Sequence, residues 1–374
     1  MIQKRGNMSI SDKKRVVLKV GSALIAPKNN GCSSHNLLAI AQFIIKCRSQ
    51  GKQIVLVSSG SVAAGRKWFN TQTMTVALKR AMAATGQTDM MEMWDKLFDF
   101  PSAQLLLTND DIRNKERFDS IRDTIEALLA HEVLPIINEN DTVTSDDRKV
   151  GDNDNLAAMV ASSIDADALI MFTDVDGLYD KNPQQHSDAN KLCKIENITE
   201  EIFAMAGGAN SDQGTGGMRT KIEAAEKATS HGIDTYIVDG FDPKTFEQLS
   251  KGLNPGTHFL ADTKPMSAGL HWMTHTVKEC GEVTVRDSES KANDHEDGVT
   301  SNRILAVKGE FAVGDTILLR DDEGNKIAKA TANYSSCLLN YLADDEIRSK
   351  LDKNSSLLHN SIISNKHMAV LENS

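Results

Sequence analysis

The sequence is short of the features that mark secreted, membrane-spanning and zinc-binding proteins. Its five cysteines are scattered, odd in number and never spaced as C-x-x-C. That pattern argues against a disulfide framework or a zinc site and indicates a reducing compartment such as the cytoplasm. No apolar run approaches the roughly 20 residues that a membrane span requires. The basic N-terminus "MIQKRGNMSISDKKR" lacks an apolar segment, so it predicts no secretory signal, and we expect residues 1–14 to be a disordered leader.

Positive charge is also in short supply. Lys and Arg number 42 against 52 Asp and Glu, which gives a formal net charge of −10. This balance argues against broad electrostatic binding to nucleic acid or to an anionic membrane. In the acid-rich region 281–350 the residues Tyr334 and Tyr341 are isolated, so the sequence does not indicate base-stacking pairs or RNA binding.

A repeated pattern fills the first 240 residues. Short apolar, often β-branched runs end in small polar residues, and a segment of helical period follows. The runs are 15–22, 53–60, 133–141, 168–177 and 234–240, and the helical segments are 34–50, 75–98, 117–131, 154–164 and 218–231. Near-continuous apolar strands that alternate with helices predict an α/β fold with a mainly parallel sheet.

Polar residues stand at the carboxyl ends of these predicted strands. In open parallel sheets the ligand binds outside the carboxyl ends of the strands, so the residues should converge on one rim. They are 19–22, 58–60, 138–141, Thr173 and Asp174.

Lys19 interrupts a run that otherwise predicts a buried strand. A lysine is rarely buried without a partner, and at the rim its charge could stabilise a phosphoryl group during transfer. The alternative is a lysine that reaches solvent from an edge strand. Gly21 beside it would let a ligand approach closely. In "SSGSVAAG" (58–65) the G-x-S-x-G nucleophile motif is missing, which favours anion-binding donors around Gly60 over a serine nucleophile.

The stretch "DQGTGGMRTKIEAAEKATSHG" (212–232) is a glycine-rich turn followed by a predicted helix. Free amides and the positive end of the helix dipole suit a phosphate there, and Lys221 adds a point charge. The spacing matches neither the P-loop nor the dinucleotide motif. An ordinary glycine turn before an amphipathic helix remains the alternative.

The stretch "VGDNDNLAAMV" (150–160) crowds four polar side chains onto one helix start, although a helix cap needs only one. Asn153 could donate to a carboxylate, Asp154 could hold lysine ammonium groups, and Asp141 in "NENDTV" could bind a substrate ammonium. Two well-capped helix starts are the alternative interpretation.

After about residue 270 the pattern changes to short alternating strands and turns, which predict a small β-rich domain. The acidic stretch 287–298 predicts a mobile loop. We place the boundaries of the α/β domain at 15–265, a linker at 266–275, the β-rich domain at 276–355 and a tail at 356–374.

Six motifs together resemble those of the glutamate 5-kinases within the amino-acid kinase family. They are "VLKVGSALI", "VLVSSGSVAAGR", "PIINENDTV", "KVGDNDNLAA", "TDVDGLY" and "GTGGMRTKIEAA", in the family's order between about residues 15 and 262. The resemblance implies a three-layer α/β/α sandwich that phosphorylates the γ-carboxylate of L-glutamate with ATP and Mg²⁺, the first step of proline synthesis. Residues 281–336 are similar to the PUA domain of many such kinases.

The resemblance also implies roles for single residues. Lys19 and Lys221 match phosphate-contacting lysines, Asp154 the aspartate that organises them, and Gly21 and Gly60 the glycines whose amides line the phosphoryl path. The glutamate-binding positions are Ser59, Asp141 and Asn153, and the ATP site comprises Lys19, Thr173, Asp174, Thr215, Gly216, Gly217, Met218, Arg219, Thr220 and Lys221. No residues are assigned to a protein-held metal. Ala23 departs from the family, which often has a hydroxyl there.

The family implies further partners: proline as a feedback inhibitor, a second copy or more in a homo-dimer or homo-tetramer, and a handoff of the product to the next enzyme. Two alternatives stay open. One is a kinase for another acceptor, such as aspartate, N-acetylglutamate, carbamate or a nucleoside monophosphate. The other is an RNA-binding protein that uses the PUA-like domain on a kinase-like scaffold.

Overall fold

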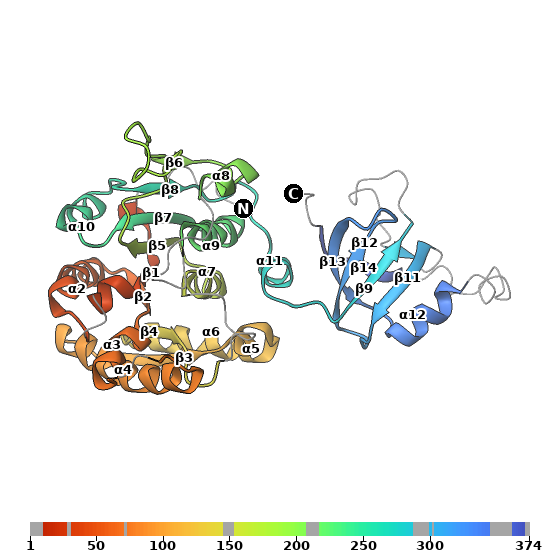
Figure 1. Ribbon diagram of the computed structural model, residues 1–374. Helices are drawn as coiled ribbons and strands as arrows, with labels where there is room; N and C mark the ends of the chain where they lie inside the picture. Colours follow the sequence, from red (N-terminus) through yellow and green to blue (C-terminus); the bar gives the residue numbers. More distant parts are fainter. Residues whose placement is uncertain are drawn as a thin grey trace. The chain divides into compact units, whose positions relative to one another are not determined.

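The structure is a computed structural model, and the chain divides into two compact units, Met1–Met266 and Ser267–Ser374 (Figure 1). Each unit is described by itself. The described residues are 10–27, 31–70, 73–144, 153–206, 217–286, 299–300, 303–344 and 361–370, the last with side chains for 361–363. Among them, none of the helices is both long and apolar enough to cross a membrane.

The first unit is built on one mainly parallel sheet. Within the described residues its strand order is β3-β4-β2-β1-β5-β7-β8-β6, and these neighbouring strands pair in parallel except for β7 and β8, which are antiparallel. The parallel sheet predicted from the apolar runs is confirmed. The strands are β1 (Arg15–Val20), β2 (Gln53–Ser58), β3 (Ser102–Leu107), β4 (Leu134–Glu139), β5 (Ala168–Thr173), β6 (Lys194–Ile195), β7 (Asp234–Asp239) and β8 (Thr257–Phe259).

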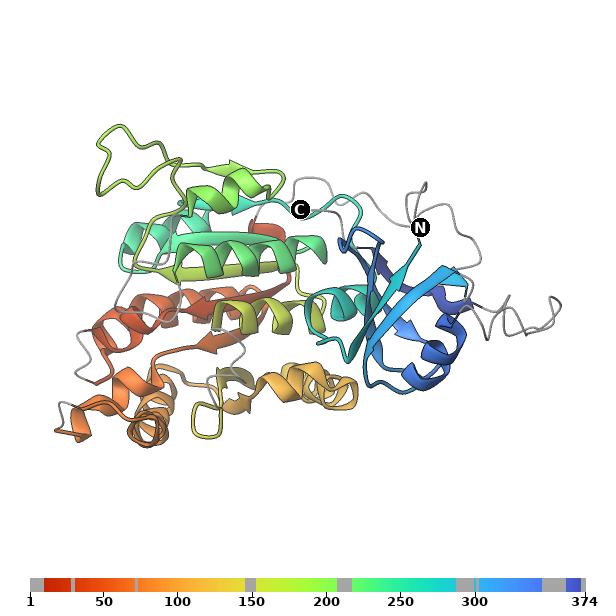
Figure 2. The ribbon, with the colours of Figure 1, turned by 45° about the vertical axis from the view of Figure 1, so that its right-hand side comes forward.

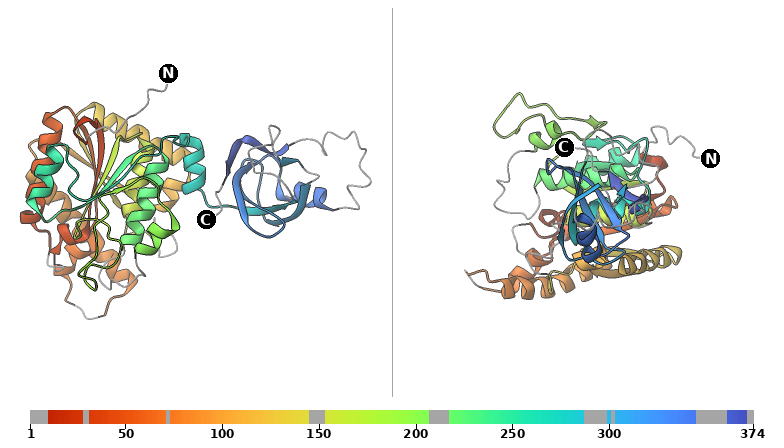
Figure 3. Two further views of the ribbon diagram at one scale, coloured as in Figure 1. Left: turned by 90° about the horizontal axis from the view of Figure 1, so that it is seen from above. Right: turned by 90° about the vertical axis from the view of Figure 1, so that its right-hand side faces the viewer.

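Helices cover both faces of this sheet and complete a three-layer sandwich (Figures 1 and 3). One layer contains α2 (Ser34–Ser49), α4 (Val76–Leu97) and α10 (Pro243–Ser250), whose apolar residues share a core with β1, β2, β4, β5 and β7. The other contains α6 (Lys115–Ala130), α7 (Asn153–Ser163) and α9 (Met218–Ser230), which contact the sheet and one another (Figure 2). Except for α10, each of these helices begins and ends within two residues of a predicted segment.

Some elements of the first unit were not expected from the sequence. The edge strand β3 has only one buried residue, Leu107, so its apolar signal is weak. The segment Ile10–Asp12, within the expected leader, forms a 3-10 helix with Ile10 buried. In the part of this unit that the structure describes, the short helices α1 (Ser22–Ile25), α3 (Ser61–Gly65), α5 (Asn109–Arg113) and α8 (Glu200–Met205) connect the main elements.

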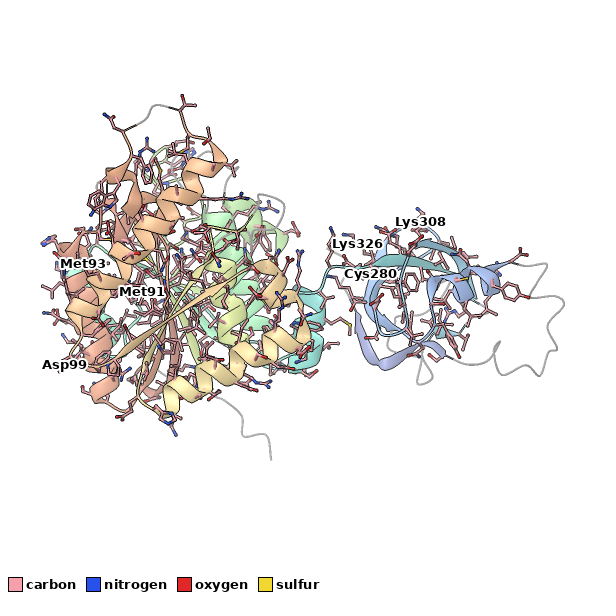
Figure 4. All side chains as sticks on the ribbon, turned by 90° about the horizontal axis from the view of Figure 1, so that it is seen from below. Met91, Met93, Asp99, Cys280, Lys308 and Lys326 are labelled. Atoms are coloured by element: carbon pink, nitrogen blue, oxygen red, sulfur yellow. The ribbon has the colours of Figure 1, made fainter. Side chains whose placement is uncertain are left out.

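Helices α3 and α4 pack with their backbones in direct contact. A Cβ atom added at Gly65 would lie 1.9 Å from the carbonyl oxygen of Met82, and one at Gly86 would lie 1.8 Å from the carbonyl oxygen of Ser61. Real side chains do not tolerate such separations, so only glycine permits this approach. The methionines Met91 and Met93 of α4 are partly buried against the neighbouring core (Figure 4).

The second unit is the β-rich domain that the sequence predicts. Within the described residues its sheet has the order β10-β14-β13-β12-β9-β11, and a core of aliphatic residues lies against α12. Lys308 on β11 and Lys326 on β13 are labelled on this unit in Figure 4. The elements are α11 (Ala268–His275), β9 (Gly281–Val285), β10 (Val299–Thr300), β11 (Ile304–Gly309), β12 (Thr316–Arg320), β13 (Lys326–Ala332), α12 (Ser336–Ala343) and β14 (Ser361–Val370).

Two segments of the second unit differ from their expected roles. Ala268–His275, expected as linker, is the helix α11 with His271 buried. Ser361–Val370, expected as tail, is the strand β14, which pairs antiparallel with β10 and β13. Ile362 and Ile363 are fully buried. Cross-strand pairing and the burial of these two side chains stabilise β14. Its polar residues interrupt the apolar alternation by which a strand is recognised, so the sequence did not indicate it. The acidic stretch 287–298 lies outside the described residues.

An ionic cluster ties the N-terminal segment to β7 and β8. The carboxylate of Asp234 is paired with the ammonium group of Lys13 and accepts hydrogen bonds from His258 Nε2 at 3.0 Å and the Ala261 amide at 3.1 Å. Burial alone would raise the pKa of Asp234, but the hydrogen bond from His258 and the charge of Lys13 outweigh it and lower the pKa to about 2.

This cluster predicts a pH dependence of stability. Because the folded pKa of Asp234 is below the unfolded value of about 3.9, its contribution is present above that value and is lost as the pH falls from about 4 towards 2. Urea unfolding should therefore give free energies of unfolding for the wild type and Asp234→Asn whose difference decreases by about 2 kcal/mol as the pH falls from about 4 to 2. A constant difference would contradict the assignment.

Candidate active site

Three buried charged side chains meet near the carboxyl ends of the parallel strands. Lys19 Nζ lies 2.5 Å from Asp154 Oδ1, and Lys221 Nζ lies 3.2 Å from Asp154 Oδ2. Asp154 is fully buried and each lysine is 6% exposed. Thr220 Oγ1 donates to Asp154 Oδ2 at 3.1 Å. The cluster therefore holds one more positive charge than negative, in a place shielded from water.

The charge state of Asp154 follows from its two lysine partners. Burial alone would raise the pKa of this carboxyl group, but the ammonium groups of Lys19 and Lys221 outweigh burial and lower the pKa to about 2. Asp154 is therefore ionised at neutral pH. An ionised carboxylate between two lysines keeps both ammonium groups in place.

Strand alternation explains why the three residues meet. Val16, Leu18 and Val20 of β1 belong to the core shared with α2, so the side chain of Lys19 lies on the opposite face of the sheet. That face is covered by α7 and α9, which pack against each other. Asp154 and Lys221 lie in the first turns of these helices. The alternative of a lysine on an edge strand is wrong, because β1 lies between β2 and β5.

The two glycines at the strand ends differ in what their backbones do. Gly60 has φ 95°, and a Cβ there would lie 3.0 Å from Ile25 Cβ, so a larger residue would be strained. Gly21 has an ordinary φ of −69°, and its amide donates to the Phe172 carbonyl at 3.0 Å. The Gly21 N–H is thus engaged within the sheet, which differs from the expectation that it lines the phosphoryl path.

A chain of side-chain amides leads to Asn153. Asn138 Nδ2 donates to Gln87 Oε1 at 2.8 Å, and Asn138 Oδ1 accepts from Asn153 Nδ2 at 3.0 Å and from the Glu139 amide at 2.9 Å. A backbone amide can only donate, so the Glu139 N–H fixes which way each amide in the chain points. Asn153 is therefore oriented from α4 through β4.

Asp141 stands at the edge of a cavity of about 620 Å³ between α4, β3 and the segment after β4. Ser61 Oγ donates to Asp141 Oδ2 at 2.7 Å. Four of the lining residues are acids, Glu92, Asp95, Glu139 and Asp141. Such a lining favours a cationic group. Ser59, directly after β2, is 8% exposed. Its amide donates to the Val20 carbonyl oxygen at 3.1 Å.

The expected nucleotide residues lie at the ends of β5 and α9. Thr173 Oγ1 donates to the exposed Asp174 Oδ1 at 3.0 Å, and the Thr173 carbonyl accepts from the Gly240 amide at 2.8 Å. Gly217, Met218, Arg219 and Thr220 form the start of α9. Arg219 is turned to Glu223 at 3.2 Å. Thr215 and Gly216 lie outside the described residues.

Sequence reasoning missed two residues of this site, Ser61 and Gln87. Ser61 bonds to a partner 80 positions away and Gln87 to one 51 positions away. No local motif points to either contact. The polar run 138–141 was expected at the rim, but the role of Asn138 as the link between Gln87 and Asn153 appears only in the folded chain.

Comparisons with known proteins agree with this architecture. A family model described as the amino acid kinase family matches residues 14–239, and one described as the PUA domain matches residues 281–342. The chain is 59% identical over 363 residues to glutamate 5-kinase 1 of Pseudoalteromonas translucida (strain TAC 125), covering 96% of this chain and 98% of that protein. It is 47% identical over 365 residues to the glutamate 5-kinase of Idiomarina loihiensis, with coverage of 96% and 98%.

A parallel sheet with a cationic cluster at its strand ends, together with the family match over residues 14–239, shows that the chain belongs to the amino acid kinase family. It is a phosphotransferase with a carboxyl group as acceptor, and it carries a C-terminal PUA domain. Within the family the chain belongs to the glutamate 5-kinases.

Proposed function

We propose that the chain transfers the γ-phosphoryl group of ATP to the γ-carboxylate of L-glutamate and so makes L-glutamyl 5-phosphate, the first step of proline biosynthesis. The observation that carries the proposal is the buried pair of ammonium groups on Asp154 at the ends of the strands. The identity of the acceptor is supported by the 59% and 47% identity to proteins named glutamate 5-kinase.

The chemistry needs charge neutralisation more than proton transfer. The glutamate side chain, with a reference pKa of about 4.3, is already ionised near neutral pH, so no general base is required. The obstacle is repulsion between this carboxylate and the triphosphate. Phosphoryl transfer is catalysed mainly by positioning and electrostatic stabilisation. Lys19 and Lys221 would contact the phosphoryl oxygens while Asp154 holds both lysines in place.

The two substrates would approach the lysines from different sides. Asp141 would bind the α-ammonium group of glutamate, and Asn153 and Ser59 would donate to its carboxylates. The glycine turn at Gly60 would lie along the phosphoryl path. On the nucleotide side, Thr173 and Asp174 at the end of β5 and residues 215–221 before and within α9 would hold ATP.

Magnesium would enter with the nucleotide. Among the described residues, no three or more His, Cys, Asp or Glu side chains gather in a way that could hold a metal ion. Mg²⁺ commonly binds through substrate phosphates and one or two carboxylates, and it keeps several waters. The exposed Asp174 carboxylate fits such a role, and bound Mg²⁺ would neutralise part of the triphosphate charge.

Proline would inhibit by competing at the glutamate site and the adjacent segment 142–150, of which residues 145–150 lie outside the described residues. The acyl phosphate product hydrolyses and cyclises readily, so direct transfer to the next enzyme would protect it. The family implies a homo-dimer or homo-tetramer, which light scattering on the purified chain would test.

The acceptor can be identified by trapping the product as a hydroxamate. With ATP, Mg²⁺ and hydroxylamine, L-glutamate should give glutamyl hydroxamate and release ADP, because Asp141 at the acid-lined cavity would bind its ammonium group. Aspartate, N-acetylglutamate and carbamate should release far less ADP, and added proline should suppress the reaction. A preference for any of the other acceptors would refute the proposed function.

A further inference from the structure

The side chain of Ser61 contacts Asp141, the proposed ammonium-binding carboxylate. Its Oγ lies 2.7 Å from Asp141 Oδ2. An ionised carboxylate has no proton to give, so Ser61 is the donor. Ser61 is 2% exposed, which shields this hydrogen bond from competing water. Hydrogen bonds to charged groups are stronger than those between neutral groups.

The backbone of Ser61 is held firmly from two sides. Gly60 precedes it with φ 95° and is packed against Ile25 and Ser22. On the other side, the Gly86 Cα of α4 lies so close that an added Cβ would be 1.8 Å from the Ser61 carbonyl oxygen. Because neither neighbour leaves room for movement, the backbone of Ser61 that carries the hydroxyl group is fixed in position.

Asp141, in contrast, lies on a turn after β4 and not within a strand or helix. The preceding residue is tied to β3 through the Asn140 amide, which donates to the Leu107 carbonyl at 2.8 Å. Backbone ties alone do not set the rotation of an aspartate side chain. The hydrogen bond from Ser61 restrains this rotation at the rim of the acid-lined cavity.

We propose that Ser61 is a positioning residue that fixes the Asp141 carboxylate for the ammonium group of the acceptor and so makes the site selective for amino acids over dicarboxylates without an amine. This inference rests on the proposed function. Ser61 would act through Asp141 alone and would not touch the phosphoryl group, so it should influence acceptor binding and not the transfer step.

The test compares Ser61→Ala with the wild type in steady-state kinetics. We expect the KM for L-glutamate to rise about tenfold, as for the loss of one hydrogen bond to a charged group, with kcat and the KM for ATP changed less than about twofold. The inhibition constant of glutarate, which has the same carboxylates but no amine, should stay the same. Equal weakening of glutamate and glutarate would overturn the proposal.

A double-mutant cycle separates positioning from a structural effect. In the Asp141→Ala background, Ser61→Ala should add no further rise in the KM for glutamate, because the group that it positions is gone. A full additional rise would overturn the proposal. The control is Thr257→Val on β8, on the opposite side of the sheet from β4, which removes a buried hydroxyl that accepts from the Leu178 amide at 2.8 Å and donates to the Leu192 carbonyl at 2.7 Å. It should lower thermal stability and leave the KM for glutamate unchanged.

The acceptor panel and the Ser61→Ala kinetics distinguish failure of the proposed function from failure of this inference. The function is decided by the acceptor panel with the unaltered chain. If the wild type preferred an acceptor without a free amine, the function would fail and the inference would fall with it. If the wild type used glutamate and Ser61→Ala left its KM unchanged, only the inference would fail.

Discussion

Replacing Lys221 or Lys19 with alanine is expected to lower kcat about 100-fold or more, as for the loss of a strong donor to the transition state. Each lysine brings a positive charge to a place where water cannot substitute for it, since each is only 6% exposed. Either variant keeps one lysine on Asp154, so the fold should survive. The measurement is steady-state kinetics at saturating ATP and glutamate.

Lys227→Ala is a matched control for this prediction. Lys227 also lies on α9 and also bonds to a residue of α7, in its case Asn155, but it is not part of the cluster around Asp154. Its loss should leave kcat within about twofold, because it removes a charge of the same kind that does not face the phosphoryl path. If both Lys19→Ala and Lys221→Ala turned over normally, the assignment of the active site would be wrong.

Replacing Asp154 with asparagine is expected to have the largest effect on stability. The substitution leaves two buried ammonium groups without their carboxylate. Removing one partner of a buried ion pair commonly costs about 3 to 5 kcal/mol. Activity should fall as well, because the two like charges would repel and lose their common anchor. Urea unfolding and kinetics on the same sample would measure both effects.

The control for the aspartate prediction is Asp242→Asn. Asp242 caps α10 by accepting from the Lys244 amide at 2.9 Å, and asparagine caps a helix about as well as aspartate. Its unfolding free energy should stay within about 0.5 kcal/mol of the wild type. An Asp154→Asn variant as stable and as active as this control would show that the cluster has no special role.

Much of the fold could be predicted from local patterns. The runs at 15–22, 53–60 and 168–177 are apolar on both faces because both faces of the sheet are covered, so each strand was recognisable without its neighbours. The edge strand Ser102–Leu107 and the late strand Ser361–Val370 escaped detection. Strands of this kind are defined by their partners more than by their own composition.

The candidate site was predictable to a similar extent. A lysine in a buried strand and a surplus of polar groups at a helix start both indicate a functional site, because a buried charge is costly without a partner, and here Lys19 and Asp154 are partners of each other. The contacts Ser61 to Asp141 and Gln87 to Asn138 left no such trace. Serine and glutamine are common in helices and loops, and nothing about their local sequence makes them unusual.

The sequence by itself determined most of the buried strands and longer helices of the first unit and that Lys19, Asp154 and Lys221 stand at element ends, because hydrophobic periodicity and helix-capping preferences act over a few residues. Only the tertiary structure decided that α7 and α9 cover the face of β1 on which Lys19 lies, and that α3 approaches α4 closely enough to place Ser61 on Asp141. Those choices depend on packing between segments far apart in the chain, and local preferences do not encode which distant partner a side chain will meet.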